Sequence, residues 1–242
     1  GKAGAMTLSA GKYSAPAETG GADEGGALSL TSGYALTGSS GSVILKTANA
    51  ASIASSVGPK SSGSINIGTG HSFYGTGGEI TIAVGQGDSG DGGDISLTAG
   101  QTSTSEVPSS GGYRGGNIDI NAGLTWDSAA ATGGSIKLTS GHSALTTSGS
   151  VTLSTSNSGT TGASGSFVVN TGRSTVGATG AISLTTGVAL SGAIAGGITL
   201  EIGSRASGGA GGDISLVAGG TDSDAGTTGG ALRFTSGTSA DT

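Results

Sequence analysis

Few residues of this chain have types and spacings that could support chemistry. Asp88, Asp91 and Asp94 form its densest acidic cluster, in a glycine-rich stretch, and Asp222 with Asp224 forms a lesser one. Carboxylates at glycine-rich turns can bridge calcium, as they do in nonapeptide β-roll repeats. These aspartates do not recur from repeat to repeat. We therefore expect solvated turn carboxylates, with calcium binding at Asp88, Asp91 and Asp94 as the alternative.

Two short patterns resemble known sites, and both fail on context. Residues 85–90 (Gly-Gln-Gly-Asp-Ser-Gly) match the dinucleotide pattern G-x-G-x-x-G, but 53 of the 242 residues are glycine and no helix is expected to follow. Residues 87–90 are similar to the stretch around a serine-protease nucleophile, without a paired histidine. His71 and His142 each follow a repeat glycine, which indicates turns rather than a metal site. We predict no catalytic, cofactor or metal site and no enzyme activity.

The composition narrows the class of protein. Charged residues make up 10% of the chain, aromatic residues 3% and hydrophobic residues 33%, with no cysteine and a net charge of −6. So few large side chains cannot fill one ordinary core, yet the hydrophobic content is high and the charge low for a disordered chain. The acidic balance argues against a nucleic-acid partner. No apolar run is long enough to span a membrane.

One seven-residue motif recurs along the whole chain, as in residues 94–100 (Asp-Ile-Ser-Leu-Thr-Ala-Gly). Its second and fourth residues are apolar, and a glycine usually ends it. Neighbouring copies are 15 to 23 residues apart. The first apolar residues of the fourteen copies are Met6, Leu28, Val43, Ile65, Ile80, Ile95, Ile118, Ile136, Val151, Phe167, Ile182, Ile198, Ile214 and Leu232. A regular period of this kind indicates a stacked repeat array.

Each motif predicts a β-strand with one apolar face, because alternate side chains of a strand point to opposite sides. We expect an all-β protein, a parallel β-helix-like β-solenoid of about fourteen strand motifs. The expected inward residues include Ile95, Leu97, Ile136, Leu138, Ile214 and Leu216, and the expected exposed ones Ser96, Lys137 and Ser215. One motif per rung fits the pattern, and so do two motifs with opposed apolar faces. We expect two.

Three longer intervals predict loop insertions at 12–25, 48–62 and 101–115. Each contains one proline, which cannot donate to a strand ladder. These loops and one spacer also hold aromatic and basic residues that fall outside the motif, of the kinds that interfaces favour. The residues concerned are Pro16, Pro59, Pro108, Tyr13, Tyr113, Arg114 and Trp126.

The residues between the two apolar positions bear on ice binding, for which a flat face with regular threonine rows would be typical. The row contains Thr7, Thr81 and Thr152, but Asp119 and Lys137 are among the residues that interrupt it. An ice- or glycan-binding module that uses one flat Ser/Thr-rich face therefore remains the alternative function.

The motif resembles two groups of repeat proteins. Residues 134–141 (Gly-Ser-Ile-Lys-Leu-Thr-Ser-Gly) resemble filamentous-haemagglutinin-type adhesins. Residues 88–100 (Asp-Ser-Gly-Asp-Gly-Gly-Asp-Ile-Ser-Leu-Thr-Ala-Gly) are similar to Gly/Ser/Thr-rich repeats in secreted proteins of microalgae. The resemblance implies an extracellular or cell-surface setting and a role in fibres or attachment. It transfers no site residues.

These observations predict a single array over 1–242, either a segment of a longer chain or a filament subunit. No cap is evident at either end of the array, and an uncapped solenoid end can pair with another copy. We therefore expect a structural protein of an extracellular fibre or adhesin stalk that associates with itself head to tail. Glycans or other cell-surface components are the alternative partners.

Overall fold

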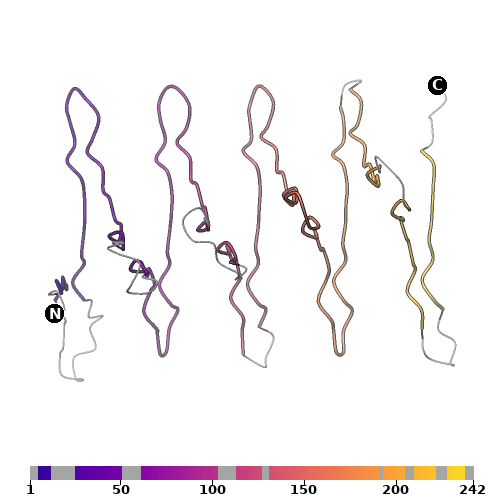
Figure 1. The fold of residues 1–242 in the computed structure, drawn as a ribbon, viewed down its shortest axis with the longest axis horizontal. Coiled ribbons are helices and arrows are strands. Elements are labelled where there is room, and N and C mark those ends of the chain that lie inside the picture. Colours follow the sequence, from indigo (N-terminus) through magenta and orange to yellow (C-terminus); the bar gives the residue numbers. More distant parts are fainter. Residues whose placement is uncertain are drawn as a thin grey trace. The chain divides into compact units, whose positions relative to one another are not determined.

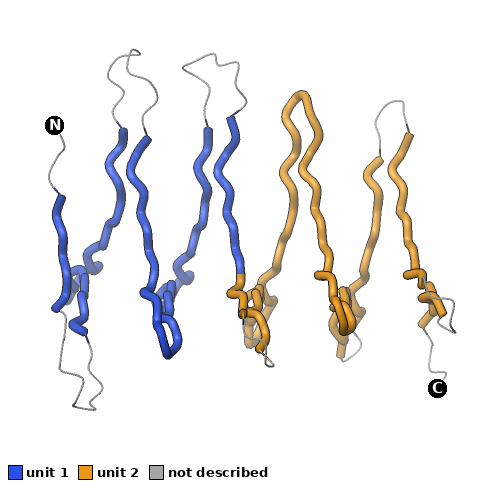
Figure 2. The backbone as a smooth tube through the Cα atoms, turned by 90° about the horizontal axis from the view of Figure 1, so that it is seen from below, with its two compact units in different colours: residues 1–121 blue, residues 122–242 orange. Residues whose placement is uncertain are grey.

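The structure is a computed structural model that describes residues 5–11, 25–50, 61–102, 113–126, 131–190, 193–204, 210–221 and 228–237. Within these ranges the chain has no helix and no paired β-strand. It divides into two units, residues 1–121 and 122–242 (Figure 2). The single repeat array over 1–242 stays a prediction.

Within each unit the seven-residue motifs are extended segments joined by loops (Figure 1). Alternating Ile, Val and Thr favour extended backbone because branching at Cβ restricts the side-chain torsion next to the backbone. Glycines flank nearly every segment and accommodate the change of direction. Two of them, Gly90 (φ 83°) and Gly162 (φ 119°), adopt the left-handed backbone region that favours glycine, at bends over 88–90 and 160–162.

The predicted β-solenoid is wrong, because neighbouring segments of the described chain do not pair into a sheet. The chain exposes 24064 Å² of solvent-accessible surface. A compact protein of 22.3 kDa would expose about 9,400 Å², and a fully unfolded one about 32,000 Å². The extended segments therefore lack the backbone hydrogen bonds between neighbouring segments that a solenoid would require.

The predicted burial pattern fails for the same reason. Ile95, Leu97, Ile136, Leu138, Ile214 and Leu216 are 51–71% exposed rather than buried. Ser96, Lys137 and Ser215 are exposed as expected, but so are their apolar neighbours. No described residue is buried. A strand pattern specifies which side chains share a face, and burial of that face requires a partner surface.

The expected two motifs per rung also need correction. In the first unit the loops 34–40 and 86–92 turn at the same end of the view, while 71–77 turns at the opposite end (Figure 1). Two other loops separate 34–40 from 86–92 along the sequence. The second unit shows the same order, with 142–148 and 173–179 at opposite ends and 157–164 between them (Figure 1). Within each unit the path therefore repeats every three segments.

Candidate functional site

The recurring structural feature is the neck, which we define as the place where the chain leaves one motif, forms a loop and returns to begin the next. In the neck of loop 101–115, the Gly116 N–H donates to the Gly100 carbonyl at 2.9 Å. The same glycine-to-glycine hydrogen bond closes loops of very different length. It joins Gly26 to Gly11, Gly41 to Gly33, Gly116 to Gly100, Gly134 to Gly123, Gly149 to Gly141 and Gly230 to Gly219, at 2.8–3.0 Å.

In four of these six necks a Cβ on the returning glycine would be in tight contact, 3.1–3.3 Å from the nitrogen of the glycine that it approaches, and at Gly149 and Gly41 the nearest atom would lie 3.4 and 3.5 Å away. A Cβ on Gly134 would lie 3.1 Å from the Gly123 nitrogen and 3.3 Å from the Ala122 Cβ. A Cβ on Gly116 would lie 3.2 Å from the Gly100 nitrogen. The glycine that ends the preceding motif is different, because a Cβ on Gly100 or Gly123 would meet nothing within 4 Å. The two glycines of one neck therefore have different requirements.

A second recurring feature is a turn closed by serine in loops of seven residues. The Ser143 Oγ accepts a hydrogen bond from the Thr146 N–H at 3.0 Å and lies 2.9 Å from the Thr146 Oγ1. The Ser174 Oγ accepts from the Gly177 N–H in the same way, at 3.0 Å. These local bonds fix a bend without help from the rest of the chain. Ser72 occupies the same position in loop 71–77 and Ala35 in loop 34–40.

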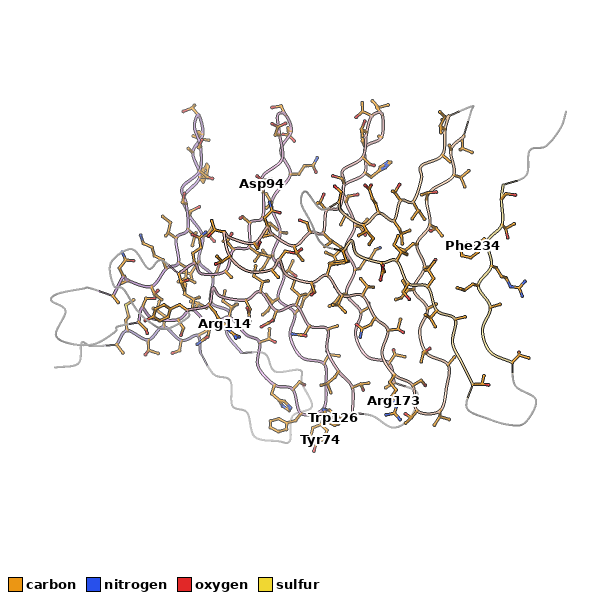
Figure 3. All side chains as sticks on the ribbon, turned by 45° about the vertical axis from the view of Figure 1, so that its right-hand side comes forward. Tyr74, Asp94, Arg114, Trp126, Arg173 and Phe234 are labelled. Atoms are coloured by element: carbon orange, nitrogen blue, oxygen red, sulfur yellow. The ribbon has the colours of Figure 1, made fainter. Side chains whose placement is uncertain are left out.

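The same four loops carry large apolar side chains at their tips, Leu36, Phe73, Tyr74, Leu145 and Val176, which are 86–106% exposed. These residues fall outside the repeated motif and were not predicted as functional, although the equal length of the four loops was a usable signal. Figure 3 shows Tyr74 at the outer edge of its loop. The rings of His71 and Phe73 contact edge to face, with centroids 4.9 Å apart. His71 and His142 each stand first in one of these loops.

The predicted calcium residues lie on the loop 86–92 and just after it. Asp88 is in the bend over 88–90, Asp91 follows the bend, and Asp94 opens the next extended segment (Figure 3). Across the described ranges no three His, Asp or Glu side chains form a group that could hold a metal ion. Calcium binding stays a prediction. Asp222 and Asp224 lie outside the described residues.

The two short patterns in this region belong to the same loop. Residues 85–90 end one extended segment and form the bend that Gly90 completes. No helix follows within the described stretch 61–102, so nothing there would present a helix N-terminus to a phosphate.

The predicted contact residues are only partly described. Trp126 is 93% exposed, and Tyr113 and Arg114 are also exposed. Tyr13 and the three prolines Pro16, Pro59 and Pro108 lie outside the described residues, as does most of each predicted loop insertion at 12–25, 48–62 and 101–115. Phe234, 83% exposed, projects from the last extended segment (Figure 3).

Comparison with known protein families, with curated proteins and with solved structures finds no match to this chain. The resemblance to surface adhesins and microalgal repeat proteins therefore stays a prediction, carried by the motif alone. Over the described residues, no helix is long and apolar enough to cross a membrane.

Proposed function

We propose that this chain is a structural protein of an extracellular fibre or adhesin stalk, in which copies of the chain associate through their extended motifs. The observation that carries the proposal is the exposure of the motif residues. All fourteen motifs present two apolar side chains in the same register, and each of these side chains is at least 47% exposed. An exposed apolar pattern of this extent indicates a surface that a partner covers.

The energetics favour association because an isolated motif cannot pair its own backbone. Burial of one aliphatic side chain contributes roughly 1.5–3 kcal/mol. An extended segment with free backbone groups is also a template for another segment of the same kind. Association satisfies both requirements at once, since it buries the apolar face and supplies hydrogen-bond partners.

A second copy of this chain is the partner that the pattern fits best. All fourteen motifs have apolar residues at positions two and four, so a motif of one chain matches any motif of a second chain in length and in apolar spacing. Only 10% of the residues are charged and the net charge is −6 over 242 residues, so repulsion between copies is weak. Pairing of motif with motif replaces the head-to-tail route through solenoid edges, because the described part of the chain forms no solenoid. The extracellular location rests on the resemblance of the motif.

Sedimentation velocity and negative-stain electron microscopy over a rising concentration series test the proposal. The wild-type chain should form filaments. The triple variant Leu97→Thr, Leu138→Thr and Leu216→Thr should need a higher concentration, because it removes three apolar motif side chains and keeps residues that favour extended backbone.

The matched control removes as many apolar side chains from loop tips, through Leu36→Thr, Leu145→Thr and Val176→Thr, and it should assemble as the wild type does. Single monodisperse particles of the wild type at every concentration would rule out the fibre. In that case thermal hysteresis and glycan-array measurements would test the ice- or glycan-binding alternative.

A further inference from the structure

Some necks have the glycine-to-glycine hydrogen bond and others do not, and its presence correlates with the residue type at one position of the preceding motif. We number the motif residues one to seven, so that position six is Ala99 in residues 94–100. In the six hydrogen-bonded necks, position six is Ala or Ser: Ala10, Ser32, Ala99, Ala122, Ser140 and Ala218. In the seven other necks, whose first and last residues are described and do not form this bond, it is β-branched: Thr47, Thr69, Val84, Thr155, Thr171, Thr186 and Ile202.

The geometry gives the cause. In the bonded necks the returning glycine faces the Cβ of position six, as Gly116 faces the Ala99 Cβ. In the other necks it faces a γ-carbon. A Cβ on Gly93 would lie 2.8 Å from the Val84 Cγ1, one on Gly212 3.0 Å from the Ile202 Cγ2, and one on Gly180 3.5 Å from the Thr171 Cγ2. The γ-carbon occupies the side from which the glycine would have to approach.

Serine behaves as alanine does, although it also has a γ atom. Serine has one such atom, which can rotate away from the opposite segment. Threonine, valine and isoleucine have two, so only the one rotamer that directs the Cβ hydrogen at the opposite segment keeps both γ atoms away from it. Branching at Cβ, rather than polarity or size alone, separates the two kinds of neck.

We propose that β-branching at position six is a built-in conformational device that holds a neck open, and that Ala or Ser at this position lets it close on the glycine-to-glycine hydrogen bond. The open necks are grouped within each unit. In 1–121 the order is two closed necks, three open and one closed, and in 122–242 it is two closed, four open and one closed. Each unit therefore has closed necks at both ends and a central block in which neighbouring segments are free to separate.

Four single variants of the full chain in dilute solution test the device, with the exchange rate of the returning glycine amide as the readout. Ala99→Val should open its neck and speed exchange at Gly116 by roughly 2- to 10-fold, the range expected for loss of one net hydrogen bond. Ala99→Ser is the matched control and should leave that rate unchanged. Thr171→Ser and Thr171→Ala should both close an open neck and slow exchange at Gly180 by a similar factor.

The Thr171→Ser variant keeps the hydroxyl and removes only the methyl group, so it isolates branching from polarity. Slower exchange at Gly180 in this variant supports the device. Unchanged exchange at Gly180 in both Thr171 variants would overturn it, even if Ala99→Val perturbs its own neck by general damage. Equal exchange at Gly116 in Ala99→Val and Ala99→Ser would overturn it as well.

Discussion

At the residue scale, the two glycines of one neck have different steric surroundings, which the glycine content of the chain does not reveal. Gly116 stands where a Cβ would lie 3.4 Å from the Ala99 Cβ, whereas Gly100, in the same neck, faces open space. The first glycine is required by close approach of two backbones. The second lies at the end of a motif and contributes its carbonyl, which any residue has.

This difference predicts opposite outcomes for alanine at the two positions. Gly116→Ala should weaken the bond to the Gly100 carbonyl, because the new Cβ forces the segments apart, and amide exchange at residue 116 should rise roughly 2- to 10-fold. Gly100→Ala should leave the neck closed. Both variants reduce the backbone freedom of the unfolded chain by a similar amount. A difference between them therefore reports the steric contact of the new Cβ at residue 116. Equal exchange rates at residue 116 in the two variants would show that the approach in this neck is not tight.

Two serines that close turns are among the least exposed residues of the described chain. Ser143 and Ser174 are half-buried among a described chain that is otherwise almost entirely exposed. The remaining half-buried residues are Ser32, Thr47, Ala99, Ser140, Ala189 and Ala218, of which all but Ala189 stand at position six of a motif. The best-covered residues of the described chain therefore lie mainly in serine turns and necks, and the apolar residues at positions two and four of the motifs are not among them.

At the element scale, the sequence could predict the segments but not their pairing. Period-two alternation and flanking glycines located the fourteen segments, and the structure shows them extended. Burial of Ile95 and Leu97 depended on a partner that alternation does not identify, so that prediction was wrong. Neck closure was missed because it depends on whether position six is branched at Cβ, as Thr171 is and Ala99 is not. Period-two reasoning places that position on the apolar face and does not consider its branching.

The seven-residue loops support a prediction at this scale. Ser143→Ala and Ser174→Ala should each remove the bond to the amide three residues later, and exchange at Thr146 and Gly177 should become faster. Ala35→Ser should have the opposite effect, because it supplies the hydroxyl at the same position of loop 34–40, which has the same length. Solution NMR exchange of the amides at 38, 146 and 177 measures all three. No slowing at Gly38 would mean that the serine turn needs more than loop length and this hydroxyl.

At the scale of the whole molecule, the two units have the same plan. Each begins with closed necks, continues through a block of open necks and ends with a closed one. The open blocks leave more glycine N–H and carbonyl groups free than the closed ones do. If copies pair through their motifs, the central block of each unit offers the backbone groups that are least committed within the chain.

The last prediction distinguishes association through motifs from association through loop tips, by hydrogen exchange of the dilute chain and of the assembled fibre. Motif amides, as in 94–100, 135–141 and 213–219, should exchange rapidly in the dilute chain because these residues are exposed and make no described ladder. In the fibre the same amides should become strongly protected, since pairing between copies supplies their hydrogen bonds. Amides of loops 71–77 and 142–148 should change little. Protection confined to the loops would instead indicate that exposed tips such as Tyr74 and Leu145 hold copies together and that the motif faces remain uncovered.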